Sequence, residues 1–196
     1  MRGCSAMLTI ALQPVLELTD EQFAAICRQN PDLRLERSPR GELIIMPPTG
    51  GETGRRHLQI AVQLYLWNQQ SRLGVAFDSS TGFKLPNGAI RSPDVAWIRG
   101  DRWHALTPEQ RQGFVPLCPD FVIELRAASD DLRPLEAKMR EYLDNGLHLG
   151  WLIDPQNQRV EIYRSQMPPE VAIAPRHLFG EDLLPRFVLD LTEILP

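Results

Sequence analysis

Two short segments with the pattern of β-strands each carry one carboxylate among apolar neighbours. Residues 92–98 contain Asp94, and residues 119–126 contain Glu124. Burying an unpaired carboxylate costs several kcal/mol and two adjacent carboxylates repel each other, so a partner cation is expected. Oxygen ligands without a nearby His or Cys pair favour Mg²⁺ or Mn²⁺ over zinc. The two segments therefore predict a divalent metal site at Asp94 and Glu124.

Lys138 is one of two lysines in the chain and lies in the helix predicted over residues 132–143, directly after the second segment. Helical geometry places it about 40° from Tyr142, which belongs to the apolar stripe of that helix. Its stem can follow apolar surface while its ammonium reaches the sheet that carries Glu124. A compact charge there is suited to orienting a water or to stabilising negative charge on a phosphorane.

Each of these residues also has an ordinary structural interpretation. Asp94 follows a proline, as residues that begin a strand often do. Glu124 and Arg126 share a strand face and are compatible with an exposed ion pair on an edge strand, worth under ~1 kcal/mol. A lysine alone in a helix is most often solvated. These alternatives stay open on the residues alone.

A long amphipathic helix is predicted over residues 52–70, and its first turns are basic. Arg55, Arg56 and His57 are compatible with a solvated surface or with contacts to a phosphate backbone. Apolar residues then recur at three-and-four spacing, and we expect this stripe to lie on a sheet. The stripe consists of Leu58, Ala61, Val62, Tyr65 and Leu66.

The remaining pattern alternates helices with strands. A crossover over residues 121–154, with its central helix, predicts two parallel strands, whereas the strands between residues 74 and 98 are expected to be antiparallel. We therefore expect an α/β (α+β) fold in which helices flank a mixed sheet. Further helices are predicted at 19–30 and from 107, and strands at 33–36, 42–46, 74–78, 82–85, 93–98, 121–126, 149–154, 160–164 and 188–195, with a tight turn at Asn87–Gly88.

Composition fits one folded domain. The 196 residues are 43% hydrophobic and 23% charged, which predicts a single domain over 1–196 with an N-terminal extension at 1–18 and a C-terminal loop and strand at 165–196. The net charge of −4 argues against coating nucleic acid by bulk electrostatics, so any DNA contact must be local. Three separated cysteines predict a reducing, cytoplasmic location, and no apolar run predicts a membrane span.

Five segments, in this order and spacing, resemble the Uma-type family of restriction endonucleases within the PD-(D/E)XK nuclease superfamily. The resemblance runs from about Leu18 to the C-terminus. It implies a restriction-endonuclease-like fold and hydrolysis of DNA phosphodiester bonds with Mg²⁺ or Mn²⁺. The segments are residues 41–52, Ser92-Pro93-Asp94-Val95-Ala96, Pro119 to Glu124, Lys138 to Tyr142 and Gly150 to Pro155.

The resemblance also implies roles for single residues. Asp94 and Glu124 are expected to be metal ligands, with Glu52 as a further carboxylate from the long helix. Lys138 would replace the lysine that the parent motif places two residues after its glutamate, where this chain has Arg126. The usual serine and proline that follow are Ala127 and Ala128 here. Arg126, Ser129 and Tyr142 are the expected accessory residues.

The sequence thus predicts a metal-dependent DNA endonuclease with Asp94, Glu124 and Lys138 as catalytic residues. Symmetric cutting of a duplex needs two active sites, so a homodimer is expected. The alternative is an inactive module that keeps the nuclease fold and binds nucleic acid or protein. A structural scaffold, which would bind no metal, is a third class.

Overall fold

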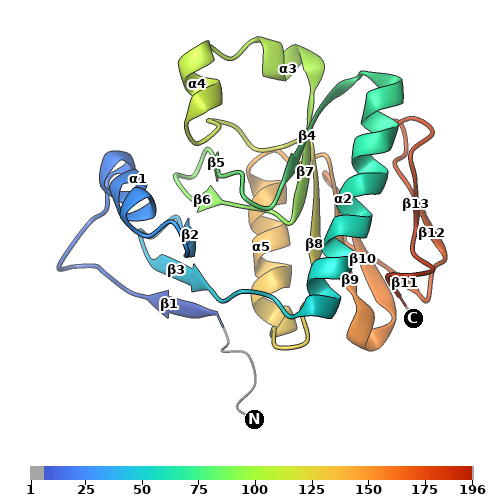
Figure 1. Ribbon diagram of the computed structural model, residues 1–196, viewed down its shortest axis with the longest axis horizontal. Helices are drawn as coiled ribbons and strands as arrows, with labels where there is room; N and C mark the ends of the chain where they lie inside the picture. Colours follow the sequence, from blue (N-terminus) through green and yellow to red (C-terminus); the bar gives the residue numbers. More distant parts are fainter. Residues whose placement is uncertain (1–6, 196) are drawn as a thin grey trace.

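The computed structural model describes residues 7–195, which form a large six-stranded sheet, a small five-stranded sheet and a two-stranded sheet of β12 and β13, with helices packed against them (Figure 1). The expected α+β fold, a mixed sheet flanked by helices, is confirmed. The elements are β1 (Leu8–Ile10), α1 (Asp20–Gln29), β2 (Arg34–Arg37), β3 (Leu43–Met46), α2 (Gly51–Ser71), β4 (Gly74–Asp78), β5 (Phe83–Lys84), β6 (Ile90–Arg91), β7 (Val95–Arg99), α3 (Gly100–His104), α4 (Pro108–Gln112), β8 (Phe121–Leu125), α5 (Leu132–Asp144), β9 (Leu149–Asp154), β10 (Arg159–Arg164), β11 (Glu170–Ile173), β12 (His177–Phe179) and β13 (Val188–Asp190).

The large sheet has six strands in the order β11-β10-β9-β8-β7-β4. Strands β8 and β9 are parallel and are joined by α5, as the sequence predicts, and the other neighbours pair antiparallel. Strand β8 therefore lies inside the sheet, with β7 and β9 on its two sides. Because β8 is not an edge strand, neighbouring strands shield its residues on both sides, and Glu124 is accordingly buried.

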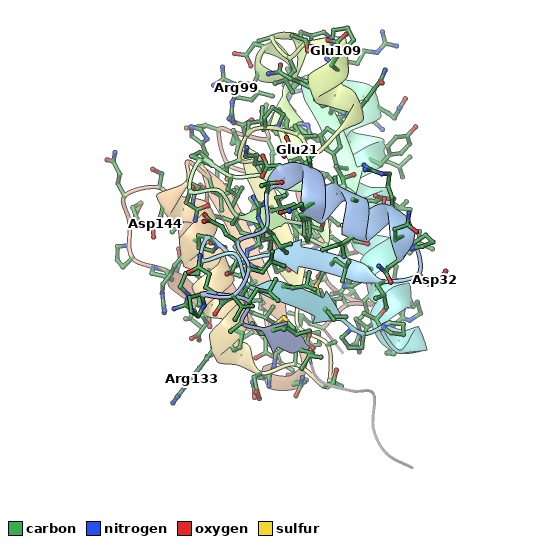
Figure 2. All side chains as sticks on the ribbon, turned by 90° about the vertical axis from the view of Figure 1, so that its left-hand side faces the viewer. Glu21, Asp32, Arg99, Glu109, Arg133 and Asp144 are labelled. Carbon is green, nitrogen blue, oxygen red and sulfur yellow. The ribbon has the colours of Figure 1, made fainter. Side chains whose placement is uncertain are left out.

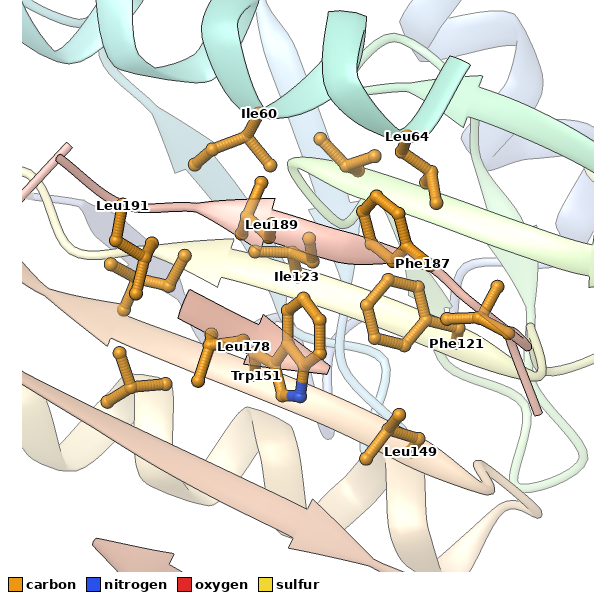
Figure 3. Close-up of a cluster of buried hydrophobic side chains, with 14 of the residues drawn as sticks. Ile60, Leu64, Phe121, Ile123, Leu149, Trp151, Leu178, Phe187, Leu189 and Leu191 are labelled. Atoms are coloured by element: carbon orange, nitrogen blue, oxygen red, sulfur yellow. The ribbon is translucent and has the colours of Figure 1, made fainter. Parts of the chain in front are cut away.

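Alternation along β7 and β8 sorts their side chains onto the two faces as expected. One face carries Phe121, which packs with Ile60 of α2 and with Phe187 near the C-terminus (Figure 3). Trp97 of β7 belongs to the same buried cluster. The other face carries Ala96, Ile98 and Val122 beneath α5, whose buried residues are Met139 and Tyr142. Glu124 belongs to this second face because it is two residues beyond Val122.

The small sheet has the order β1-β3-β2-β6-β5. The predicted hairpin of β2 and β3 is confirmed, and α1 packs over this sheet through Phe23 (Figure 2). Strand β6 pairs with β2 at Arg37 and Ile90, which attaches the segment between β4 and β7 to the N-terminal part of the chain. The strands between residues 74 and 98 pair antiparallel as expected, β4 with β7 and β5 with β6, but β5 and β6 belong to the small sheet.

Several short elements were not predicted, namely β1, β6, α3, β11 and β12, and the terminal strand β13 ends at Asp190 instead of 195. The tight turn at Asn87–Gly88, which was expected between the strands at 82–85 and 93–98, instead joins β5 to β6, and Gly88 has a φ of +87°. Two- to four-residue strands lack the alternation on which prediction depends. Of the expected N-terminal extension, residues 1–6 lie outside the described residues. No helix within residues 7–195 has the length and apolar character needed to cross a membrane.

Only part of the apolar stripe predicted for α2 faces the sheet, because Ala61 packs against the core but most of the other members do not. Ile60 and Leu64 are buried instead, whereas Leu58, Tyr65 and Leu66 are exposed. The helix is apolar on more than one side, so its periodicity does not single out one face. The C-terminal segment decides the orientation, because Phe187 and its neighbours pack on the side of Ile60 and Leu64.

Candidate active site

The ammonium of Lys138 joins two buried carboxylates. Its Nζ lies 2.8 Å from Oε1 of Glu124 and 2.9 Å from Oε1 of Glu36, and all three side chains are almost fully buried. Glu124 comes from β8, Lys138 from α5 and Glu36 from β2, so one lysine connects the large sheet, its crossover helix and the small sheet. The structure thus places Lys138 against Glu124, as its position at the rim of the α5 stripe predicts.

Tyr142 completes the contacts of Glu124. It follows Lys138 by one helical turn on α5, and its hydroxyl donates a hydrogen bond to Oε1 of Glu124 at 3.1 Å. The Lys138 Nζ also lies 5.9 Å from the centre of the Tyr142 ring. Burial raises the pKa of the Tyr142 hydroxyl well above its ordinary value, so this group stays a donor. The spacing of four residues explains why both side chains reach the same carboxylate.

Glu36 is a member of the site that sequence reasoning missed. Its carboxylate accepts a hydrogen bond from the Ser92 backbone N–H at 2.9 Å, and it lies 3.0 Å from Nη1 of Arg91. Arg91 in turn lies 2.6 Å from Glu141 of α5. The only sequence signal is a glutamate between a leucine and an arginine in a short strand. That pattern does not separate a buried residue from an exposed one.

Asp94 lies where β7 begins, beside the end of β8. The Leu125 backbone N–H donates a hydrogen bond to Oδ2 of Asp94 at 2.9 Å, and Nε2 of His57 lies 3.2 Å from the same oxygen. Arg34 approaches Oδ1 at 3.8 Å. The surface interpretation of His57 was therefore wrong, because its side chain is mostly buried against Asp94 where α2 passes the end of the sheet.

The charges around Glu124 are not neutralised by the protein alone. Burial raises the pKa of Glu124 to about 7 against the opposing effect of Lys138, and the charges of Asp94 and Glu36 raise it further. Lys138 itself has a raised pKa, because Glu124 and Glu36 outweigh the effect of its burial, so it is a fixed cation. Burial and the two neighbouring carboxylates therefore favour the neutral form of Glu124 more than in a solvated glutamate, in spite of Lys138.

The donor types fit a hard divalent cation. Asp94 and Glu124 offer carboxylate oxygens, which Mg²⁺ and Mn²⁺ prefer, and a bound cation would supply the positive charge that the raised pKa of Glu124 calls for. Within residues 7–195 no group of three or more His, Cys, Asp or Glu side chains converges as a ready-made metal site. The residues that fit the ion are therefore these two carboxylates.

Glu52 is not brought to this site. It lies in the first turn of α2 with an exposed side chain, and its carboxylate lies 2.6 Å from Arg55 and 3.3 Å from Arg56. Arg55 also approaches Glu193 at 3.6 Å. The favourable position of an acid at a helix N-terminus accounts for Glu52 without a ligand role. The two arginines are paired with acidic side chains and directly precede His57 in the helix.

Arg126 does not pair with Glu124, so the interpretation of an exposed ion pair on an edge strand was wrong. Its Nη1 lies 3.1 Å from Asp154 on the neighbouring strand β9, and its Nε donates to the backbone oxygen of Asp130 at 3.0 Å. Ser129 is exposed and contacts Asp130 at 3.5 Å. These two accessory residues support the turn between β8 and α5 and do not contact Lys138.

Comparisons with known proteins give the family. A family model, Uma2, described as "Putative restriction endonuclease", matches residues 20–192. A solved structure, described as a putative nuclease belonging to DUF820 from Anabaena variabilis, matches with a TM-score of 0.68 and 21% identity over 82% of this chain and 89% of that one. No curated protein matches the chain. The structural likeness supports the fold, and the family match over most of the chain shows that this protein belongs to the Uma2 family.

Proposed function

We propose that this protein is a divalent-metal-dependent endonuclease that hydrolyses DNA phosphodiester bonds at the site formed by Asp94, Glu124 and Lys138. The observation that carries the proposal is the buried Lys138 ammonium, 2.8 Å from Glu124 and 2.9 Å from Glu36, in a cluster that still leaves Glu124 with a raised pKa. In a purely structural ion pair the lysine would be expected to hold the pKa of its glutamate at or below the ordinary value, whereas that of Glu124 is raised. Membership of the Uma2 family supports the same reaction class.

Asp94 and Glu124 would hold Mg²⁺ or Mn²⁺, and the ion supplies Lewis-acid chemistry at the phosphodiester when bound. The protein fixes both ligands before substrate arrives. The Leu125 N–H and His57 orient the Asp94 carboxylate, while the Tyr142 hydroxyl orients that of Glu124. Such orientation from groups behind a ligand is what keeps a metal site ready for binding.

Lys138 would keep a positive charge beside the scissile phosphate. Its raised pKa ensures that the ammonium stays protonated, so it can orient an attacking water through hydrogen bonds or stabilise charge that develops on the phosphoryl oxygens. It cannot act as a general base for the same reason. Glu36 and the Ser92 carbonyl, at 3.5 Å from Nζ, hold the ammonium in place.

DNA contacts would be local, since the chain has a net charge of −4. Arg55 and Arg56 directly precede His57 on α2, and His57 contacts Asp94, so these arginines are the proposed contacts to DNA that approaches the site. Each is paired with Glu52, and DNA would have to replace that partner. Glu52 is therefore left out of the proposed ligand set and is assigned the role of holding these side chains.

Calorimetric titration of Mn²⁺ and Mg²⁺ tests the metal site directly. Wild type should bind, and Asp94→Asn and Glu124→Gln should both lose binding because each removes a ligand charge without changing side-chain volume. Glu52→Gln is the matched control and should bind as wild type does. Metal binding that survives both site variants would contradict the ligand assignment.

Cleavage of supercoiled plasmid and of oligonucleotides with Mn²⁺ then tests the reaction. Wild type should cut, and Lys138→Gln should bind metal without cutting at a comparable rate. A wild type that binds metal and DNA but cuts neither substrate would indicate the inactive binding module instead.

A further inference from the structure

Arg34 lies at the Asp94 end of the proposed site. It is the first residue of β2, and alternation along the strand places it on the same face as Glu36. The other face of β2, which carries Leu35, packs beneath α1. Glu36 contacts Lys138. Arg34 reaches the other end of the site, with its Nη2 3.8 Å from Oδ1 of Asp94. One strand of the small sheet thus supplies a side chain to both ends of the site.

The guanidinium of Arg34 has hydrogen-bond donors that the protein does not use. Its Nη2 donates to the backbone oxygen of Ser79 at 3.3 Å, and its Nε is buried with no hydrogen-bond partner within residues 7–195. The carboxylate of Asp94, at 3.8 Å, is beyond the range of a hydrogen bond. A buried N–H donor without an acceptor is unfavourable. The position therefore favours an acceptor that comes from outside the protein.

The neighbouring cations are already paired and enclosed. Lys138 and Arg91 both lie against the Glu36 carboxylate, at 2.9 and 3.0 Å. Their side chains are 10% and 11% exposed, whereas that of Arg34 is 32% exposed. Of these three cations, Arg34 is therefore the one that is both accessible from solvent and loosely paired. A substrate at Asp94 would be within reach of its guanidinium.

We propose that Arg34 is a further catalytic residue, which donates hydrogen bonds to the non-bridging oxygens of the scissile phosphate. An arginine keeps its charge at any working pH, and its planar fork matches the geometry of phosphate oxygens. In the hydrolysis, the water oxygen bonds to phosphorus, the bond from phosphorus to the leaving oxygen breaks, and the leaving oxygen takes the proton that the water loses. Arg34 gives up no proton and stabilises the negative charge that develops on the phosphoryl oxygens. The inference rests on the proposed nuclease function and adds to it a residue that contacts the substrate.

The salt dependence of DNA binding tests the phosphate contact on the full chain. Fluorescence anisotropy with a labelled duplex and Mn²⁺ is measured in the Lys138→Gln background, which slows cutting. There Arg34→Gln should lower the affinity about tenfold and reduce the slope of log affinity against log salt concentration by about 0.9, the value for one phosphate contact. Arg34→Lys should keep the slope, because it keeps the charge. Arg99→Gln is the matched control and should change neither value, because Arg99 is exposed at the opposite end of β7 from Asp94.

Plasmid cleavage with Mn²⁺, in the chain that retains Lys138, tests the catalytic role. At saturating DNA, Arg34→Gln should cut about 100-fold more slowly than wild type. Arg34→Lys should recover part of that loss, because it restores the charge without the planar fork. Calorimetry should give Arg34→Gln an affinity for Mn²⁺ equal to or above that of wild type, because a cation beside Asp94 has been removed. Melting curves check that each variant is folded.

An unchanged salt slope together with a wild-type cleavage rate in Arg34→Gln would overturn the proposal, as would equal losses in Arg99→Gln or the absence of DNA binding in every chain. A loss of Mn²⁺ affinity in Arg34→Gln with an unchanged salt slope would also overturn it, because Arg34 would then only position Asp94. Failure of the nuclease proposal would appear differently, as a wild type that binds Mn²⁺ and DNA without cutting. In that case a salt slope reduced by Arg34→Gln would still establish the phosphate contact of Arg34.

Discussion

Two aspartates in this protein follow a proline and begin neighbouring antiparallel strands. Asp94 precedes β7 and Asp120 precedes β8, so they lie at opposite ends of the same strand pair. Each accepts a backbone hydrogen bond from the strand beside it at 2.9 Å, Asp94 from Leu125 and Asp120 from Arg99. The two Pro-Asp pairs therefore have the same local role: each aspartate accepts a hydrogen bond from a backbone N–H at the end of the adjacent strand.

Their surroundings differ. Asp120 is fully buried with Oδ1 2.8 Å from Arg102 and 3.4 Å from His148, so it is surrounded by cationic and donor groups. Asp94 also has basic neighbours, His57 and Arg34, but it lies in addition close enough to Glu124 to raise the pKa of that carboxyl group. A buried carboxylate beside cations stabilises a fold, whereas one beside another carboxylate creates a demand for a cation. The neighbours supplied by distant segments therefore distinguish the proposed metal ligand, Asp94, from Asp120.

The largest expected difference between the two aspartates is in cleavage. Asp94→Asn should lower the rate of DNA cleavage by ~1000-fold or more, because it removes a metal ligand from the reacting centre. Asp120→Asn should cut at a rate near that of wild type at a temperature where it is folded. The measurement is the initial rate of plasmid nicking with Mn²⁺. Comparable losses in both variants would remove the functional distinction between them.

For the free energy of unfolding, the order of the two variants should be reversed: Asp120→Asn should have the larger effect and Asp94→Asn the smaller one. Asp120→Asn removes the charge that pairs a fully buried carboxylate with the partly exposed Arg102, which should lower the free energy of unfolding by about 2 kcal/mol. For a chain of this length that corresponds to a fall in the melting temperature of roughly 6 °C. Asp94→Asn should be affected less in the metal-free protein, because the loss of its contacts with His57 and Arg34 is offset by the loss of repulsion with Glu124. Calorimetric melting curves without metal give both values.

Metal affinity should depend on pH through Glu124. Its pKa is raised to about 7, so the proton must leave before a cation binds. The affinity for Mn²⁺ is therefore expected to be constant above pH 8 and to fall about tenfold per pH unit well below pH 7. Asp120→Asn should reproduce this profile, because Asp120 lies at the other end of β8. A profile that is flat between pH 5 and pH 8 would show that Glu124 does not hold the ion.

Glu52 should have the smallest effect. Glu52→Gln removes an exposed pairing with Arg55 and Arg56, so neither the melting temperature nor Mn²⁺ affinity should change measurably. Cleavage should be unchanged or slightly faster, since two arginines become available to DNA. A loss of Mn²⁺ binding in this variant would show that Glu52 is a metal ligand together with Asp94 and Glu124.

The periodicity of apolar residues predicted the part of the site that lies within one continuous segment, namely Glu124, Lys138 and Tyr142. The crossover from β8 through α5 to β9 is regular enough that alternation places Glu124 beneath α5, and helical spacing places Lys138 and Tyr142 over it. Glu36 could not be predicted in this way, because its strand belongs to the other sheet and nothing in its four residues indicates which face is covered. Contacts between sheets depend on how the sheets dock.

Helix α2 shows a second limit of prediction from sequence periodicity. Its apolar residues lie on two sides, and the side that is buried is chosen by the C-terminal segment around Phe187. That choice turns His57 toward Asp94 and leaves Leu58 outside. Glu52, which the family resemblance placed at the site, pairs instead with Arg55 and Arg56 within the first turns of the same helix. A helix that is apolar on one side only would have been predicted correctly.

The Lys138 bridge also couples activity to folding order. Glu36 is near the beginning of the chain, and Glu124 and Lys138 are well past its middle, so the N-terminal sheet leaves the ribosome long before its partners. Until the two sheets dock, Lys138 has no second carboxylate to hold it and the site is incomplete. Hydrogen exchange of the β2 amides would therefore report when the three side chains of the proposed site come together.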